Sequence, residues 1–379
     1  MFLVIGWGLM IFLSAAVGRF LAGRPGTVIG VCTALVLASV FTFLLHRQVA
    51  SVGPAGRAGA TGRRPPEEGG PSDAPAQPAP PAAAVPARPA GEPLPERHFP
   101  RPVGRPGQAN LQPWRLPGQP GPAGICADSA LVGDLQVRAA SIVGPGHRCE
   151  EPATPRQDAY RIGVDGTGRY LIVAVADGMS DSSHSDLGAN VAVDTVVRRL
   201  RAVLTGRTVN EQDMRECFGS AAERMTATAR QRGLAPEDVR AAVLAAVVEL
   251  NPDVHGGRAV FFAAIADVSA WLRRGRSWCR IAGDGKHGLD AGRLSDFLPH
   301  FPSAVRLMTR RLDPGDVLAL TTDGIGDALL ASGELAAWFA DEWKSPPFIG
   351  RFIDTVGFEA RGQLDDRTAI VIWCPERQP

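Results

Sequence analysis

Four aspartates each stand at one end of an apolar, strand-like run of the sequence. They are Asp177 after the run 170–176, Asp284 after 280–283, Asp323 after 317–322 and Asp365 before 369–373. A carboxylate at the tip of a buried strand costs free energy unless something pairs with it, and a metal ion is one such partner. Because carboxylate oxygens are hard ligands, the pattern favours Mg2+ or Mn2+.

Asp158 is a fifth acid in this pattern. Two ions held about 4 Å apart by such residues would lower the pKa of a shared water and make it a nucleophile. Hydrolysis at phosphorus then needs positive charge on the phosphoryl oxygens and in-line attack, but no serine or cysteine nucleophile. The sequence agrees, because it contains no G-x-S-x-G, P-loop or HExxH motif.

Glycine follows two of these aspartates directly, as Gly178 and Gly324. A glycine there permits a tight turn or a close backbone approach to a metal or phosphate, and the Gly178 carbonyl is itself a candidate ligand. The alternative is that Asp-Gly is a common turn dipeptide without further meaning. Recurrence of the pattern beside several apolar runs favours the first interpretation.

The N-terminal part predicts a membrane anchor. Residues 1–18 and 26–45 are apolar runs near the roughly 20 residues that a membrane-spanning helix needs, so residues 1–48 are expected to form a transmembrane hairpin. Arginines in the loop and after the second run favour a multi-pass protein of the cell membrane with a cytoplasmic C-terminal domain. A buried helix pair of the soluble domain is the alternative.

Residues 49–125 are rich in proline, alanine and glycine and predict a disordered linker, either a spacer or a ligand for SH3-type domains. Residues 126–379 have the composition of one globular domain. The net charge of +1 gives no sign of a nucleic-acid partner. The six cysteines show no metal-ligand spacing.

Hydrophobic periodicity predicts both strands and helices in the globular part. Besides 170–176, strands are expected at 139–143, 243–250, 260–270, 278–282, 316–321 and 368–373. Helices are expected at 189–204, 211–232, 325–330, 334–343 and 348–358, and residues 286–315 are expected to be mostly loop. Because strands and helices do not alternate regularly, an α+β fold of two sheets with outer helices is predicted.

The order of the acidic motifs resembles the metal-dependent Ser/Thr protein phosphatases of the 2C type, in particular their bacterial branch. The resemblance rests on PRQDAY (155–160), VAVADGMSDSSHSDLGA (173–189), IAGDG (281–285), LDPGDVLALTTDGIGDAL (312–329) and DDRTAIVI (365–372), and it covers residues 138–375. It implies a four-layer α-β-β-α sandwich, two antiparallel sheets flanked by helices, with metals at one end.

Carried over residue by residue, the resemblance implies roles for six positions. Asp177 would bridge two Mn2+ or Mg2+ ions, Gly178 would offer its carbonyl to the second, Asp323 and Asp365 would complete the first, Asp158 would act near the second through water, and Asp284 would hold a third ion. Asp327 is a further candidate beside Asp284. The cofactors are thus two ions, or three if the Asp284 position is used.

One departure concerns phosphate binding. The arginine that the family usually carries before the acidic pair is absent, because position 153 is Ala153, and Arg148, Arg156 or His147 could take its place. Arg148 is our catalytic candidate among them. His184 is a candidate general acid for the leaving alkoxide, with an inert loop histidine as the alternative.

The resemblance predicts a membrane-anchored phosphatase that hydrolyses phosphoserine or phosphothreonine in proteins phosphorylated by a Ser/Thr kinase pathway. The missing arginine leaves open a pseudophosphatase that binds phosphoproteins at the membrane without turnover. A third possibility is a different two-metal hydrolase, acting on a phosphodiester or a nucleotide.

Overall fold

The computed structural model describes residues 101–104, 115–118, 120–283 and 296–376. The predicted transmembrane hairpin and residues 49–100 of the predicted linker lie outside these residues. Among the helices that the structure describes, none is long and apolar enough to span a bilayer.

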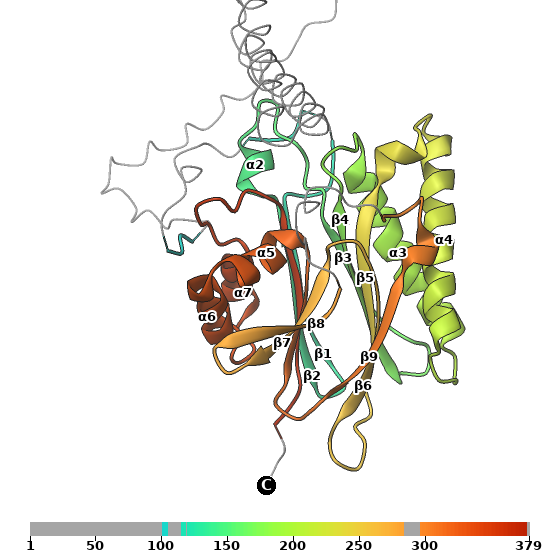
Figure 1. The fold of residues 1–379 in the computed structure, drawn as a ribbon, viewed down its shortest axis with the longest axis vertical. Helices are drawn as coiled ribbons and strands as arrows, with labels where there is room; N and C mark the ends of the chain where they lie inside the picture. The colour runs from blue at the N-terminus through green and yellow to red at the C-terminus, as the bar shows by residue number, and fades with distance from the viewer. Residues whose placement is uncertain (1–100, 105–114, 119, 284–295, 377–379) are drawn as a thin grey trace, which may run out of the picture. The chain divides into compact units, whose positions relative to one another are not determined.

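Over the described residues the strands form two antiparallel sheets that lie face to face (Figure 1). The six-stranded sheet has the order β1-β2-β11-β10-β7-β8, and the five-stranded sheet has the order β3-β4-β5-β6-β9. The strands are β1 Ile125–Val132, β2 Leu135–Ile142, β3 Ala159–Val164, β4 Tyr170–Gly178, β5 Ala241–Glu249, β6 Arg258–Ile265, β7 Ser269–Arg274, β8 Ser277–Ala282, β9 Arg306–Leu312, β10 Val317–Thr321 and β11 Arg367–Trp373.

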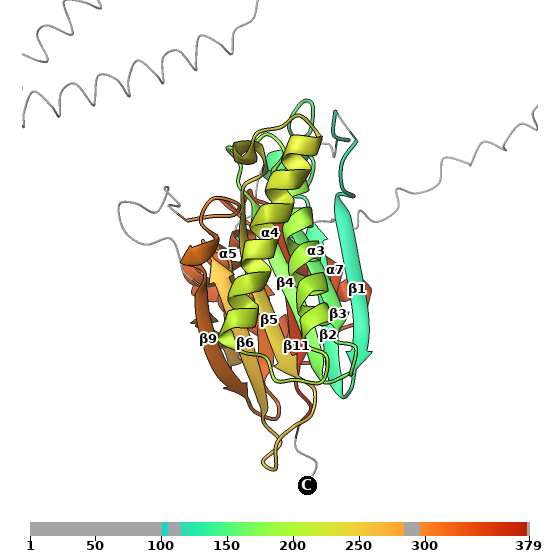
Figure 2. The ribbon, with the colours of Figure 1, turned by 90° about the vertical axis from the view of Figure 1, so that its right-hand side faces the viewer.

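Helices cover the outer faces of both sheets (Figures 1 and 2). Two long helices, α3 Ser185–Val203 and α4 Glu211–Gln231, lie on the five-stranded sheet, and α5 Asp323–Ala331, α6 Gly333–Glu342 and α7 Ile349–Val356 lie on the six-stranded sheet. Short helical turns are α2 Pro145–Arg148, η2 Pro236–Val239 and η4 Pro302–Ala304. The predicted sandwich of two antiparallel sheets between helices is confirmed.

Strand β4 explains why apolar and polar residues do not alternate in the run 170–176. Leu171, Val173 and Val175 pack between the two sheets, whereas Ile172 and Ala174 pack under the helices. A strand that is buried on both faces needs apolar residues at every position, so it reads as a continuous apolar run. Each of these side chains is completely buried.

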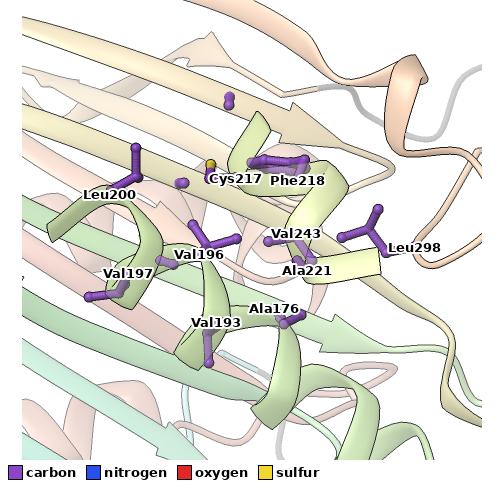
Figure 3. Packing of buried hydrophobic residues seen from close by; sticks show 14 of the residues in the cluster. Ala176, Val193, Val196, Val197, Leu200, Cys217, Phe218, Ala221, Val243 and Leu298 are labelled. Atoms are coloured by element: carbon purple, nitrogen blue, oxygen red, sulfur yellow. The ribbon is translucent and has the colours of Figure 1, made fainter. Parts of the chain in front are cut away.

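The layer between the helices and the five-stranded sheet is built from small and branched side chains. Figure 3 shows Phe218 and Ala221 of α4 beside Val193 and Val196 of α3, over Val243 of β5. Helix α4 begins with a capping box in which Asn210 accepts from the backbone of Asp213, and the Asp213 side chain accepts from the backbone of Asn210. This cap fixes where the helix starts and so which face it turns to the sheet.

The expectation of one strand over 260–270 is wrong. Strand β6 ends at Ile265, Ala266 adopts a positive φ of 67°, and β7 begins at Ser269 in the other sheet. A mostly apolar run, interrupted by Asp267 and Ser269, concealed this turn because residues on either side are buried in the same core. The chain therefore crosses from one sheet to the other at Ala266–Val268.

Three strands were not expected from the sequence. Strand β9 lies inside the stretch predicted to be loop, and β1 and β3 precede strands that were expected. β1, β3 and β9 are edge strands, and β1 and β9 are largely exposed. Polar and charged residues are common on edge strands because they discourage pairing with other chains, and they also weaken the apolar pattern.

Two short stretches of the predicted linker hydrogen-bond to the folded domain. The amide of Val103 donates to the carbonyl of Glu359 (2.9 Å), and the amide of Glu359 donates to the carbonyl of Arg101 (2.8 Å). The amide of Arg115 donates to the carbonyl of Arg148 (3.1 Å). The limits proposed for the three segments of the chain stay predictions, but these residues pack with the sandwich.

Candidate active site

The pairing of β3 with β4 brings two of the predicted site residues together. Ala159 lies opposite Ala176, so Asp158, immediately before β3, comes beside Asp177 near the end of β4. Asp158 is 1% exposed. The five-stranded sheet therefore presents two carboxyl groups at one end of the sandwich.

The six-stranded sheet supplies two more acids at the same end. Strands β10 and β11 are antiparallel with Thr321 opposite Ala369, so the end of β10 lies beside the start of β11. Asp323 follows β10 and begins α5, and Asp365 lies just before β11.

Electrostatics shows that these acids form one group. Burial raises the pKa of Asp177 well above its usual range, and the charges of Asp323, Asp158, Asp365 and Asp267 raise it further. We call these five residues the acidic cluster. Because like charges this close oppose each other's ionisation, the cluster favours a cation among its carboxylates.

Asp267 is the member of the acidic cluster that sequence reasoning missed. It lies in the turn between β6 and β7 and is 8% exposed. The expected single strand over 260–270 placed this residue in mid-strand, where no site was predicted. The sequence did contain one sign of this site residue, because Asp267 is an acid that interrupts an apolar run.

Asp365 is also affected by its neighbours. Burial of its carboxyl group raises its pKa to about 6, with the charges of Asp323 and Asp366 acting in the same direction. The residue as a whole is exposed, so its carboxyl group lies at the rim of the acidic cluster.

Asp158 is held by hydroxyl groups from the other sheet. Its Oδ2 accepts a hydrogen bond from Thr322 Oγ1 (2.7 Å) and another from Thr368 Oγ1 (2.8 Å). Burial and the charge of Asp366 raise the pKa of Asp158, and the two hydroxyl bonds act against that rise. Threonines were not predicted as site residues, since nothing in the sequence distinguishes them from other strand threonines.

Asp366, next to the predicted ligand Asp365, ties down the backbone around the site. Its carboxylate accepts from the amides of Gly144 and Gln157, at 2.6 Å each, and pairs with His147 Nδ1 at 2.9 Å. Burial alone would lower the pKa of His147, but the hydrogen bond and charge of Asp366, with Asp365 and Glu150, raise it to about 9. Asp366 therefore anchors α2 and the residue before Asp158.

The three candidates for the missing phosphate-binding residue all have partners inside the protein. Arg148 is 3% exposed and pairs with buried Glu359 (3.4 Å). Arg156 is 5% exposed and donates to Ser141 Oγ and to backbone carbonyls. His147 pairs with Asp366. The role of Arg148 in phosphate binding stays a prediction, and its position is that of an interior ion pair.

His184 lies at the start of α3 and is exposed. Its Nδ1 is 2.9 Å from Ser183 Oγ, and Ser183 Oγ donates to Asp238 Oδ1 at 2.7 Å. The imidazole is thus oriented by a serine and an acid of the η2 segment. Its role as a general acid stays a prediction.

The two predicted glycines meet protein backbone. A Cβ at Gly178 would lie 2.8 Å from the carbonyl oxygens of Gln157 and Ser185, and one at Gly324 would lie 1.9 Å from the carbonyl oxygen of Asp366. Neither glycine is among those with positive φ. Both positions therefore need glycine because protein segments of the site approach each other closely, and not because of a left-handed turn. The expected approach of their backbone to a metal or phosphate stays a prediction.

Asp284 lies outside the described residues. The preceding Gly283 has a φ of 80°, and a Cβ there would lie 2.0 Å from the carbonyl oxygen of Val268. The end of β8 is thus beside the turn that carries Asp267. Asp327 lies on α5 and is partly exposed.

The acidic cluster fits divalent cations by its donor chemistry. It offers hard carboxylate oxygens from both sheets, and the carboxyls disfavour each other's charge. Among the described residues, no three acidic, histidine or cysteine side chains stand close enough together to form a ready metal site. The carboxyl groups of the acidic cluster lie at the same end of the sandwich, and binding of a cation would require their side chains to move closer together.

A family model described as Protein phosphatase 2C matches residues 144–347, more than half of the chain. The chain belongs to the protein phosphatase 2C family. Membership of this family implies a protein serine/threonine phosphatase, and its members typically use Mn2+ or Mg2+. The matched residues include Asp158, Asp177 and Asp323, and end before Asp365. No curated protein matches the chain.

Solved structures of phosphatases resemble the described fold. A bacterial serine phosphatase matches with a TM-score of 0.48 and 13% identity, over 64% of this chain and 99% of its own. The Mycobacterium tuberculosis serine/threonine phosphatase PstP/Ppp matches with 0.45 and 14%, over 64% and 99%. PppA of Pseudomonas aeruginosa matches with 0.43 and 18%, over 63% and 96%. Identities this low do not transfer an activity, so the protein phosphatase 2C assignment rests on the sequence match.

Proposed function

We propose that this protein hydrolyses phosphoserine and phosphothreonine in proteins, at the acidic cluster, with Mn2+ or Mg2+ as cofactor. The observation that carries the proposal is the position of Asp177, half-buried at the end of β4 and within the electrostatic reach of four other aspartates from both sheets. Bringing like charges together at a partly buried site costs free energy, which a bound cation would offset. Family membership supports the reaction class.

Asp177, Asp323 and Asp365 would hold two ions, with the Gly178 carbonyl as a further ligand. When bound, two divalent ions would supply an acidified water and positive charge for the phosphoryl oxygens. Asp158 lies beside Asp177 and would orient water near the second ion. Asp284 is proposed as the ligand of a third ion.

The remaining groups serve the substrate and the leaving alkoxide. His184, exposed and oriented by Ser183, would give a proton to the departing serine or threonine oxygen. Arg148 stays the candidate for binding phosphate, although its guanidinium would have to leave Glu359 to reach a substrate.

We further propose that residues 1–48 anchor the enzyme in the cell membrane, with the phosphatase domain in the cytoplasm and residues 49–125 as a linker. The support is the pair of apolar runs and the arginines that flank them. The substrates would then be phosphoproteins of a Ser/Thr kinase pathway that come within reach of the membrane.

The function is tested by replacing Asp177 in the full-length protein. Asp177→Asn keeps the shape of the side chain and removes its charge. Loss of a residue that only supports a metal ligand costs up to roughly 100-fold in activity. Loss of the proposed ligand Asp177 should therefore lower turnover of a phosphothreonine peptide with Mn2+ by at least roughly 100-fold. Asp253→Asn, at the exposed β5–β6 connection at the opposite end of the sandwich, is the matched control and should keep wild-type turnover.

Three other results would each mean something different. Equal turnover by wild type and Asp177→Asn would refute the role of the acidic cluster. Peptide binding without phosphate release by the wild type would favour the pseudophosphatase. Release of phosphate from a phosphodiester or nucleotide, but not from the peptide, would favour another class of two-metal hydrolase.

A further inference from the structure

Behind Asp158 a guanidinium and two hydroxyls form a continuous line of hydrogen bonds. Arg156 Nη1 lies 2.5 Å from Ser141 Oγ, Ser141 Oγ lies 2.6 Å from Thr368 Oγ1, and Thr368 Oγ1 lies 2.8 Å from Asp158 Oδ2. All four residues are buried, and Ser141 and Thr368 have no exposed surface. Water therefore does not replace any of these bonds.

The chemistry of the two ends fixes the direction of every bond in the line. A guanidinium can only donate, and Oδ2 of Asp158 accepts from both threonine hydroxyls. Thr368 has one hydroxyl proton and gives it to Asp158, so Ser141 must give its own proton to Thr368 and accept from Arg156. The line thus runs in one direction, from the cation of Arg156 to the carboxylate of Asp158.

A second branch reaches the same carboxylate oxygen. The amide of Thr368 donates to Thr322 Oγ1 at 3.0 Å, and Thr322 Oγ1 donates to Asp158 Oδ2 at 2.7 Å. Because Thr322 accepts from an amide, its hydroxyl proton is directed at Asp158 as well. Both threonine bonds end on Oδ2, and neither of them uses Oδ1.

This network joins the two sheets. Asp158 leads into β3 of the five-stranded sheet. Ser141 lies in β2, Thr322 directly follows β10, and Thr368 lies in β11, and these three strands belong to the six-stranded sheet. Arg156 also donates to the backbone carbonyl of Asp158, so it holds the main chain of that residue as well as its side chain. The network therefore fixes both the rotamer of Asp158 and its place between the sheets.

We propose that Thr368, Thr322, Ser141 and Arg156 are positioning residues that lock Oδ2 of Asp158 as an acceptor and present Oδ1 to the divalent cations. This inference rests on the proposed phosphatase function and deepens it, because it assigns the residues behind the site. Changing an outer partner of a metal site in this way typically costs 10- to 100-fold in metal affinity or activity. The network is expected to act on Mn2+ affinity and kcat, and to leave the binding of substrate unchanged.

The test uses the full-length protein with three threonine variants. Thr368→Val removes the central hydroxyl at nearly constant volume, Thr368→Ser restores it, and Thr355→Val removes a hydroxyl that is equally buried but bonds only within the α6–α7 region. Mn2+ affinity is measured by titration calorimetry, and kcat and KM are measured with a phosphothreonine peptide. Ser141→Ala is a milder variant, since it cuts the link to Arg156 but keeps both threonine bonds to Asp158.

Thr368→Val should weaken Mn2+ binding and lower kcat, by roughly 10- to 100-fold in at least one of them, with KM within about twofold of wild type. Thr368→Ser should recover most of the loss, and Ser141→Ala should change both quantities in the same direction by less. If Thr368→Val does not fold, Ser141→Ala and Thr322→Val provide the same comparison.

Mn2+ affinity and kcat equal to those of Thr355→Val would overturn the inference while leaving the proposed function intact. A wild type that binds Mn2+ but releases no phosphate would remove the proposed function, and the affinity series would still decide whether these residues position Asp158. A wild type that binds no Mn2+ would overturn both.

Discussion

Because of the pair formed by His147 and Asp366, the free energy of unfolding of the domain should fall as the pH rises into the alkaline range. The pKa of His147 rises from its ordinary 6.5 to about 9 in the folded protein, and its side chain is 14% exposed. Because the folded-state pKa is the higher one, protonated His147 stabilises the fold fully below pH 6.5, and this contribution is lost as pH rises through about 9. At 1.36 kcal/mol per unit of pKa, the contribution is about 3 kcal/mol.

The perturbation is His147→Asn, which keeps a neutral donor near Asp366 but does not titrate. The free energy of unfolding is measured in urea by tryptophan fluorescence, because Trp343 and Trp373 are buried in the domain. Divalent ions are removed, since the charge of Asp365 contributes to the shift. The stability difference between wild type and His147→Asn should shrink by about 3 kcal/mol between about pH 6 and pH 10.

Taking this difference removes the contributions of titrating groups that His147 does not affect, whereas the pKa of Asp365, which the charge of His147 lowers, still differs between the two proteins. The control is His300→Asn, because His300 forms the same kind of pair with exposed Glu237 (3.1 Å) and solvent screens such pairs. Its stability difference at about pH 6 should be much smaller than that of His147→Asn. A His147→Asn difference that stays constant over this range would refute the reasoning.

Two further substitutions test the packing around the site. Gly324→Ala should destabilise the fold by about 1–3 kcal/mol, because the added Cβ would lie 1.9 Å from the Asp366 carbonyl oxygen. Gly219→Ala, inside α4 with open space around it, should instead stabilise the fold by up to about 1 kcal/mol. Both variants are measured by thermal unfolding, and equal effects would contradict the steric argument. Glu359→Gln should cost about 3–5 kcal/mol in urea unfolding, because it leaves the buried Arg148 guanidinium without this carboxylate, and a loss below about 1 kcal/mol would show that the pair is dispensable.

The sandwich itself could be predicted because its central strands are buried on both faces. The run Tyr170–Gly178 and the helix Ser185–Val203 carry strong periodic or continuous apolar signals, and both are present. The edge strands could not be predicted in the same way. Strand β9, with the sequence RLMTRRL, is mostly exposed, so its residues were not selected for a buried face.

The acids of the site were recognisable because each one breaks an apolar run at its end. The groups that hold them were not. Thr322 and Thr368 act through partners 46 to 227 positions away in sequence, and such long-range pairing follows from register, which a single sequence does not reveal. Asp366 was overlooked because it stands beside an identical residue, and only the fold shows which of the two turns inward.

The docking of residues 101–104 and 115–118 determines where the protein can be cut. A truncated version that starts at residue 126, where the composition changes, would lose the backbone partners of Glu359 and Arg148. It would also lose the Ala123 carbonyl that accepts from Arg156. Expression from Arg101 onward keeps all three partners, so a proline-rich stretch that seems dispensable should be retained in any soluble version made for crystallisation or assay.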